Sequence, residues 1–452
     1  MNIRCVLTGY TGQDDRPGNT GKKRGTILKR QVIIIGGGAS GLAAGIAAAM
    51  EGAQVTILEH MDRVGKKILS TGNGRCNMTN LSVREEHYRC SQRQFPMKVL
   101  DRFSVWDTLT FFDEIGVITK SKNGYIYPNS EQASAVLDAL RLEAAHQGVE
   151  VITECHVISI IPSGRSNGKG KQPEKPEGKK AGFQVLTDKG TFSCSRVILA
   201  AGSKAAPVTG SDGSGYELAK ALGHRIITPL PALVQLRCQG AFLKQLAGIR
   251  CEAVVKLKSE GKILAADNGE LQLTDYGVSG IPTFQISRYA SVALHQGRKV
   301  SVVLDFLPAK SMEETRRFIS RRARTMAYRI AGDFLTGVLN KKLTAVLLKQ
   351  SRISAEEPVS GIDAERLHQL IQNIKQFEMP VTATNSFEQA QVCCGGVDTR
   401  EVKPETMESR LVPGLYLAGE ILDVDGICGG YNLQWAWSTG IIAGRCAGGW
   451  KN

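Results

Sequence analysis

The first regular pattern along the chain is a short apolar run followed by a cluster of glycines. Residues 32–35 read VIII, which predicts a buried strand, and Gly36 to Gly41 predict a turn. The stretch LAAGIAAAMEG that follows is rich in strong helix formers and stops at Gly52, and QVTILE at 54–59 predicts a second buried strand. Strand, glycine turn, helix and strand within about 30 residues have the size of one βαβ unit.

Helical and strand patterns alternate in the next part of the chain. From 95 to 147 the pattern is mostly helical, with a turn at GYIYPNS, and the helical spacing of apolar residues over 131–147 stops at Gly148. Three strand-like stretches follow: VEVITECHVISI, FQVLT and TFSCSRVILA. The segment between the first two, PSGRSNGKGKQPEKPEGKKAG, predicts a mobile hairpin tip.

The character of the sequence changes near residue 206. Between 226 and 305, stretches such as AVVKLKS, ELQLTD and KVSVVLDF indicate antiparallel strands without a long helix between most of them, which favours a small β-domain or barrel. Residues 311–375 are amphipathic and rich in Lys and Arg, and they predict a helical insert. Strand patterns return after 380 and end in GLYLAGE and GGYNLQWAWSTGIIAG. If this end packs with the start, the first domain is discontinuous.

Composition adds a charge excess to this picture. The 452 residues carry a net charge of +14, and 42% of them are hydrophobic, which suits a globular protein with a large core. Much of the excess lies in residues 1–30, which predict a basic flexible extension, and in 163–181. Neither segment has a nucleic-acid reading motif, so we interpret both as solvated and expect no nucleic-acid partner. The chain also lacks a membrane-length apolar run and a secretory signal, so we expect a cytoplasmic protein.

The eleven cysteines form no CxxC pair, and no histidine stands in a metal-ligand pattern, so we expect no metal site. The adjacent Cys393 and Cys394 are predicted to be buried thiols rather than a vicinal disulfide.

The strongest chemical signal is the glycine cluster itself. It fits GxGxxG, directly follows a buried strand and opens a helix, and Glu59 ends the next strand. Gly36 permits the tight turn, Gly38 lets the backbone approach a pyrophosphate, and Gly41 lets helix and strand pack closely. The helix N-terminus offers free N–H groups and positive dipole to the phosphates. Glu59 is expected to accept hydrogen bonds from a ribose and to disfavour a 2′-phosphate, so FAD or NAD fits better than NADP.

Two later features favour FAD over NAD. Three strands and the turn RVILAAGS follow the first βαβ unit, as in FAD domains of the glutathione-reductase type, where a short Ala-Gly turn lies close to the flavin. GLYLAGE is an apolar strand ending in Gly419 and Glu420, whose carboxylate would bond a ribityl hydroxyl. We therefore predict noncovalently bound FAD.

Two long motifs make a family resemblance specific. The pairing of KKILSTGNGRCNMTN (66–80) with GLYLAGEILDVDGICGGYNLQWAWSTG (414–440) resembles the bacterial BaiN/RdsA-type flavoproteins, also described as aminoacetone-oxidase-family FAD-binding enzymes. AAGSKAAPVTGSDGSGYELAKALGH and LQLTDYGVSGIP are similar to further blocks of that family. The resemblance implies an α/β fold: a glutathione-reductase-type, Rossmann-like FAD-binding domain interrupted by a six-stranded β-barrel domain that carries a small helical insert. The implied divisions are 31–206 and 391–452 for the FAD domain, 207–310 and 373–390 for the barrel, and 311–372 for the insert.

The resemblance also implies a set of FAD contacts, in which the backbone of Val157 meets the adenine. Together with the loop glycines Gly36, Gly38 and Gly41, the set is Ala39, Ser40, Glu59, Lys67, Arg75, Cys76, Asn77, Val157, Ala201, Gly202, Gly419, Glu420, Asn432 and Leu433. Arg75 is interpreted as a partner for the pyrophosphate or flavin edge, and Cys76 as a small residue beside the flavin rather than a redox group. Trp435 and Trp437 either line the flavin site or belong to the core.

The catalytic side chains and the electron donor are less defined by the sequence. Tyr276 in TDYGVSG is one candidate proton donor, with a barrel-turn role as the alternative, and Asp423 and Asp425 are either functional or turn and cap residues. A second dinucleotide fingerprint is missing, so NAD(P)H is expected to reach the flavin at the substrate face. The expected partner is a small molecule. The main hypothesis is an FAD-dependent oxidoreductase that uses NAD(P)H to reduce an enone or an oxo-steroid or bile-acid-like compound. The alternatives are an aminoacetone-like amine oxidase and a flavin-bound sensor or nucleic-acid-binding protein.

Overall fold

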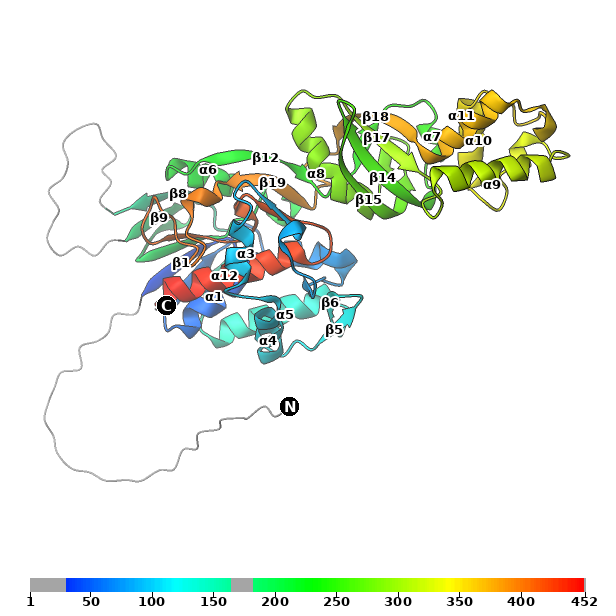
Figure 1. Ribbon diagram of the computed structural model, residues 1–452. Helices are drawn as coiled ribbons and strands as arrows, with labels where there is room; N and C mark the ends of the chain where they lie inside the picture. The colour runs from blue at the N-terminus through cyan, green and yellow to red at the C-terminus, as the bar shows by residue number, and fades with distance from the viewer. Residues whose placement is uncertain (1–29, 164–181, 451–452) are drawn as a thin grey trace, which may run out of the picture.

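The computed structural model describes residues 30–163 and 182–450 (Figure 1). The basic extension 1–30 and the insert 163–181 fall almost wholly outside these residues, so the predictions made for them stay predictions. Within the described ranges, every helix is too short or too polar to cross a bilayer.

A five-stranded parallel sheet forms the centre of the domain predicted to bind FAD (hereafter the FAD-binding domain), with the strand order β20-β11-β1-β2-β7. The predicted βαβ unit is confirmed, because β1 and β2 pair in parallel on either side of helix α1. Strand β20 comes from near the C-terminus and pairs with β11, so both ends of the chain build this sheet. The bounds are β1 (Gln31–Ile35), β2 (Gln54–Leu58), β7 (Glu150–Ile152), β11 (Arg196–Leu199) and β20 (Leu415–Leu417).

Helices α1 (Ala39–Met50) and α12 (Tyr431–Gly448) lie side by side against this sheet, the blue and red helices of Figure 1. The close approach depends on glycines spaced by four along α12. A Cβ added to Gly440 would lie 2.4 Å from the carbonyl oxygen of Ser40, and one added to Gly444 would lie 2.3 Å from that of Ala44. The glycine-bounded stretch at the C-terminus is therefore a packing surface as well as a site motif.

Smaller antiparallel sheets surround the parallel one. Residues predicted as the single stretch VEVITECHVISI divide between β7 of the parallel sheet and β8 of a three-stranded sheet, because the chain changes direction between the two strands. The turn predicted at GYIYPNS contains a strand, β6, that pairs with β5 in a hairpin. The strands are β8 (Val157–Pro162), β9 (Phe183–Thr187), β10 (Gly190–Cys194), β3 (Thr79–Asn80), β5 (Thr119–Lys122), β6 (Tyr125–Pro128), β4 (Tyr88–Cys90) and β21 (Val424–Gly426). The helices are α2 (Lys66–Ser70), α3 (Phe95–Leu100), α4 (Val105–Glu114), α5 (Ala133–His146) and α6 (Ser214–Ala221).

A closed barrel with the order β13-β16-β15-β14-β17-β18 has its own hydrophobic core. The two-stranded ribbon of β12 (Ile226–Ala232) and β19 (Val392–Val397) connects it to the FAD-binding domain. The barrel strands are β13 (Leu236–Cys238), β14 (Arg250–Ser259), β15 (Lys262–Leu273), β16 (Gly277–Ser279), β17 (Val300–Asp305) and β18 (Phe377–Thr384).

Helices accompany the barrel on two sides. Helices α9 (Met312–Thr325), α10 (Lys341–Gln350) and α11 (Ala364–Lys375) form an insert at the end away from the parallel sheet (Figure 1), and short α7 (Leu243–Leu246) lies nearby. Helix α8 (Ile281–His295) lies between two barrel strands in the sequence, where mostly strands were predicted. Its β-branched and aromatic residues gave it a strand-like composition. The domain divisions inferred from the resemblance stay predictions.

Candidate active site

One cavity of about 810 Å³ lies where the glycine loop meets the hairpin β5–β6, helix α8 and strand β19. This volume is in the range of small-molecule and cofactor sites. Most of the FAD contacts predicted from the sequence line it: Gly36, Gly38, Ala39, Ser40, Glu59, Lys67, Arg75, Asn77, Val157, Ala201, Gly202, Glu420, Asn432 and Leu433. These residues come from segments far apart in the sequence, so the fold brings them to one place.

The three motif glycines of the β1–α1 turn, Gly36, Gly38 and Gly41, have three different surroundings. Gly36 has φ +100°, a conformation that favours glycine. A Cβ on Gly41 would lie 1.9 Å from the Gly36 carbonyl oxygen, so this position needs a hydrogen. A Cβ on Gly38 would meet no atom within 4 Å, because Gly38 faces the cavity. The open space lies directly at the N-terminus of α1, whose first N–H groups have no partner within the helix.

Glu59 is a buried carboxylate beside this loop. It accepts hydrogen bonds from the backbone N–H groups of Gly37, at 2.7 Å, and of Met61, at 2.9 Å. These bonds fix the carboxylate at the end of β2, on the wall of the cavity. A ribose hydroxyl that reached it would donate a further hydrogen bond, as the ribose role predicted for Glu59 requires.

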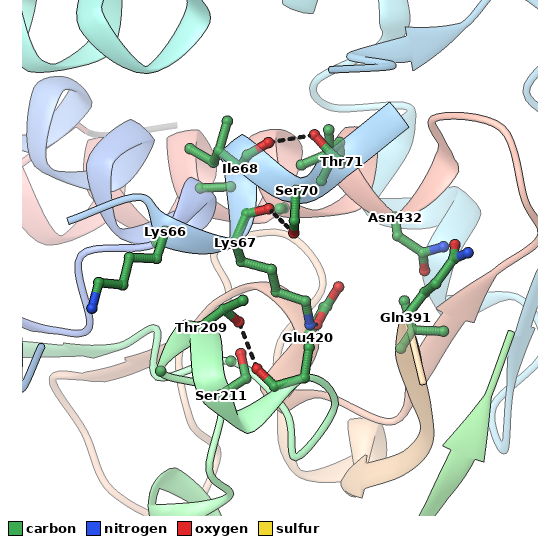
Figure 2. A pocket seen from close by; sticks show the side chains of 18 of the residues that line it. Lys66, Lys67, Ile68, Ser70, Thr71, Thr209, Ser211, Gln391, Glu420 and Asn432 are labelled. Atoms are coloured by element: carbon green, nitrogen blue, oxygen red, sulfur yellow. Dashed lines mark hydrogen bonds and ion pairs between the residues drawn. The ribbon is translucent and has the colours of Figure 1, made fainter. Parts of the chain in front are cut away.

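Lys67 and Glu420 form an ion pair in the cavity wall, with 2.6 Å between Nζ and Oε2 (Figure 2). The hydroxyl of Ser203 donates to the same carboxylate oxygen at 3.1 Å, and Lys67 also donates to the carbonyl of Ala205 at 3.3 Å. Both charged groups are about one-fifth exposed, so the pair is shielded on most sides. It places one positive and one negative group side by side where a flavin ribityl chain is expected.

The N-terminus of α12 forms another part of the cavity wall. Gly429 and Gly430 have positive φ values of 122° and 94° and lead into the helix, and Gly430, Asn432 and Leu433 line the cavity. The side-chain oxygen of Asn432 accepts from Gly426 N–H at 2.8 Å, which holds the preceding loop. The positive end of the α12 dipole therefore faces the cavity, where it favours negative charge.

The stretch TGNGRCN forms a tight loop next to this helix start, since a Cβ added to Gly430 would lie 2.9 Å from the Asn77 side-chain oxygen. Gly72, Asn73, Gly74 and Cys76 all have positive φ values. The Arg75 guanidinium is exposed and lies over the ring of Tyr127, 5.5 Å from its centroid, so it occupies the rim of the cavity.

Three of the predicted FAD contacts and the candidate proton donor Tyr276 lie outside the lining. Gly41 packs against Gly36, and Gly419 packs against Ser40, whose Oγ would be 2.4 Å from an added Cβ. Cys76 is completely buried, and burial raises the pKa of its thiol to about 12. Tyr276 lies at a barrel turn with the Arg237 guanidinium 5.2 Å from its ring centroid, so its role as a proton donor stays a prediction without a cavity contact.

Two open alternatives are decided by packing. Trp435 and Trp437 are core residues, with exposed fractions of 1% and 0%, and their indole N–H groups donate to the carbonyls of Gly419 and Met78. Cys393 and Cys394 are free, buried thiols, as predicted.

The other wall of the cavity was not predicted from the sequence. Tyr125 and Tyr127 come from the β5–β6 hairpin, Phe284 from α8, Val392 from the start of β19, and Gln391 from the residue before it. The alternation in YIY was a usable signal, since it places both tyrosines on one face of a strand. The contributions of α8 and β19 had no local signal, because they depend on how the barrel docks.

The cavity fits a dinucleotide with a flavin. Gly38 leaves space for a pyrophosphate at one helix N-terminus, Glu59 stands beside it, and a second helix N-terminus lies where an electron-rich ring would gain from positive dipole. Among residues 30–163 and 182–450, no three His, Cys, Asp or Glu side chains come together as metal ligands. The fold and the cavity together are thus those of a Rossmann-like FAD-binding domain.

Comparison with known proteins specifies the family. The family model of the HI0933-like protein Rossmann domain matches residues 30–446, and the chain belongs to this family. It is 45% identical to a 3-dehydro-bile acid delta(4,6)-reductase of Clostridium scindens over 92% of this chain and 98% of the relative. It is 31% identical to a ribosomal RNA dihydrouridine synthase of Haemophilus influenzae, over 90% and 96% of the two chains. The enzyme of the same name from Escherichia coli K12 is 29% identical over 90% and 95%.

Proposed function

We propose that this enzyme uses NAD(P)H to reduce a carbon–carbon double bond conjugated to a carbonyl group, in a flat apolar substrate of the oxo-steroid or bile-acid type. The observation that carries the proposal is the 45% identity to a bile-acid reductase over nearly the whole length of both chains. In balanced form, NAD(P)H and one proton are consumed, the C=C bond becomes CH–CH, and NAD(P)⁺ is released.

The wall of the cavity opposite the glycine loop supports an apolar substrate. Leu233, Phe284 and Val392 give it an apolar surface, and Tyr125 and Tyr127 add aromatic rings with hydroxyl groups. FAD, when bound here, would supply the hydride-transfer chemistry of the reduction. The chain's own residues hold the cofactor through Glu59 and the α1 N-terminus, keep Lys67 and Glu420 fixed beside it, and exclude water on the apolar side. Tyr125, partly exposed on its hairpin, is placed to hold a proton for the substrate.

An anaerobic experiment tests this proposal. The FAD-loaded enzyme is reduced with NADH or with NADPH, and bleaching of the flavin absorbance is recorded. A 3-oxo-4,6-diene bile acid is then added, which should restore the oxidised spectrum and yield a product that has gained two hydrogens. An enzyme that neither nucleotide reduces contradicts the choice of donor, and a reduced enzyme that ignores the diene contradicts the choice of substrate.

A second substrate has its own support. Dihydrouridine is uridine with its C5–C6 double bond reduced, and that bond is also conjugated to a carbonyl. Two relatives that match over nine-tenths of this chain are named as ribosomal RNA dihydrouridine synthases. The same reduced enzyme should therefore also be offered unmodified ribosomal RNA. Aminoacetone is the matching test of the amine-oxidase alternative, since an amine substrate would bleach the oxidised flavin without NAD(P)H.

A further inference from the structure

The helical insert carries a concentrated positive charge far from the cavity. Residues 310–352 contain eleven Lys and Arg against three Asp and Glu, a net charge of +8. The insert lies at the end of the barrel away from the FAD-binding domain (Figure 1), and none of its residues lines the cavity. This charge is therefore not needed to hold FAD or a small substrate.

The charge is organised as a stripe on helix α9. Arg317, Arg321 and Arg324 are spaced by four and three residues, which places them on one face of the helix, and all three are exposed. Glu313 Oε1 lies 3.7 Å from Arg317 Nε. Among the described residues, no carboxylate is within ion-pair distance of Arg321 or Arg324. The stripe is thus largely free to meet an anionic partner.

The other face of α9 holds the insert together. Thr315 and Ile319 are completely buried, and Arg322 donates through Nε to the carbonyl of Phe334 at 2.6 Å and through a second nitrogen to that of Thr336 at 2.8 Å. One arginine of the helix thus has a structural role, which separates it from the stripe. The apolar face of α9 is already covered, whereas a helix lying on a membrane must bury that face in lipid.

An exposed aromatic ring stands next to the stripe. Tyr328 follows the end of α9 and is 78% exposed, with the Arg329 guanidinium 5.6 Å from its ring centroid. Rings of this kind stack on unpaired bases, while arginine side chains pair with phosphates. Further exposed cations, Lys341, Lys342 and Lys349, follow on α10.

We propose that the Arg317–Arg321–Arg324 stripe and Tyr328 form a docking surface for a structured RNA with an unpaired loop. The choice of RNA rests in part on the second substrate proposed above. This surface is separate from the basic segments 1–30 and 163–181, and it would hold RNA while the cavity performs the reduction.

The test measures binding without turnover. The full FAD-loaded chain is titrated into a fluorescent RNA stem-loop at two salt concentrations, and the R317Q/R321Q/R324Q variant is compared with wild type. Loss of three phosphate contacts should weaken RNA binding roughly tenfold or more. It should also reduce the slope of log binding constant against log salt concentration by about 2–3 in magnitude. The control variant K98Q/R141Q/K220Q removes three exposed charges from helices α3, α5 and α6, outside the insert, and should bind as wild type does. Y328A should weaken binding of the stem-loop and leave binding of a fully paired duplex unchanged.

Several results would overturn the proposal: no RNA binding by wild type, equal binding by the stripe and control variants, or equal binding of the same sequence as DNA. Capture by phosphatidylserine vesicles that is lost with the stripe would assign the surface to membranes instead. Reduction of a small enone should be unchanged in every variant. A failure of that reaction in wild type concerns the proposed function and leaves the RNA result to be judged separately.

Discussion

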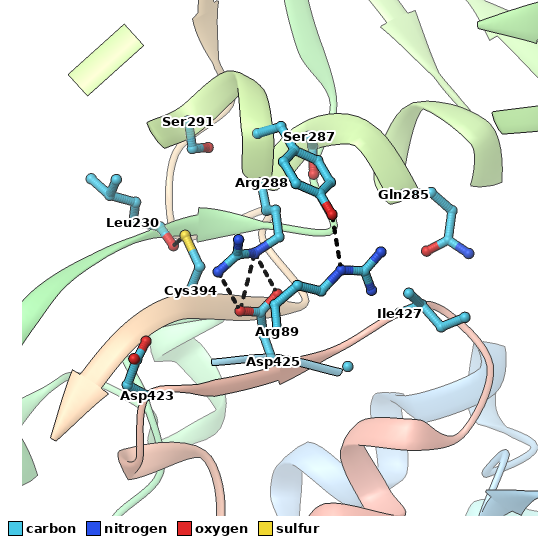
Figure 3. Close-up of polar contacts among 12 residues, drawn as sticks. Arg89, Leu230, Gln285, Ser287, Arg288, Ser291, Cys394, Asp423, Asp425 and Ile427 are labelled. Carbon is cyan, nitrogen blue, oxygen red and sulfur yellow. Dashed lines mark hydrogen bonds and ion pairs between the residues drawn. The ribbon is translucent and has the colours of Figure 1, made fainter. Parts of the chain in front are cut away.

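Arg288 on helix α8 and Asp425 on strand β21 form a two-pronged ion pair between the barrel and the FAD-binding domain, with 2.9 Å from Arg288 Nε to Asp425 Oδ2 and 2.9 Å from its terminal nitrogen to Oδ1 (Figure 3). Asp425 is 3% exposed and Arg288 19%, so both charges are removed from water. Asp425 is therefore neither a turn nor a cap residue. The pair fixes α8, and with it Phe284, against the cavity.

Replacing Arg288 by Met should therefore leave an unpaired buried carboxylate. We expect the free energy of unfolding to fall by about 3–5 kcal/mol, measured by urea unfolding, and R288M/D425L to recover most of the loss. Equal stability of the two variants would show that packing, and not charge, causes the effect.

The same variant has a predicted pH dependence. Burial raises the pKa of Asp425, and the Arg288 guanidinium opposes that shift. Without Arg288, the Asp425 carboxyl group keeps its proton to higher pH in the folded state than in the unfolded state. The free energy of unfolding therefore falls as pH rises through the raised pKa of Asp425. R288M should be less stable at about pH 8 than at about pH 5, relative to wild type at each pH.

Glu59→Gln should weaken FAD binding. A lost hydrogen bond to a charged group is worth about 1.5–3 kcal/mol, which corresponds to roughly ten- to hundredfold in the dissociation constant. The dissociation constant is measured from flavin fluorescence while FAD is titrated with the cofactor-free protein. Glu51→Gln, an exposed change at the end of α1, is the matched control. An unchanged FAD affinity in E59Q would contradict the assignment of Glu59 as a ribose contact.

Two alanine variants separate cofactor binding from folding. Gly38→Ala adds a methyl group into open space at φ −78°, so the cofactor-free protein should unfold like wild type, but its FAD affinity should fall. Gly41→Ala pushes a methyl group into the Gly36 carbonyl and should cost roughly 1–3 kcal/mol of stability. Thermal unfolding of both without FAD, followed by FAD titration, distinguishes them. Full FAD affinity in G38A would contradict the pyrophosphate position.

Cys76→Ala should retain flavin reduction by NAD(P)H. Burial raises the pKa of this thiol to about 12, so the reactive thiolate is scarcely populated near neutral pH. The native protein should accordingly resist iodoacetamide at Cys76, as peptide mass mapping can check. Loss of flavin reduction in a variant that still binds FAD would restore the redox role.

Much of the cofactor site could be predicted because its signals are local. The βαβ unit, the glycine spacing and Glu59 all lie within one short segment. There, neighbouring residues alone reveal the strand and helix periods and the steric requirements of the turn. The C-terminal motif extended this to Glu420 and Asn432, since its glycines mark the start of a helix.

Only the tertiary structure brought distant groups together. Lys67 and Glu420 are 353 positions apart, and the partner of Asp425 lies in a helix that the sequence pattern did not reveal. Burial likewise decided that Cys76 and the two tryptophans are core residues, because exposure depends on all the elements packed around a side chain and not on its neighbours in sequence. The sequence by itself determined the dinucleotide loop and its cofactor class; the docking of the barrel determined the opposite wall of the cavity.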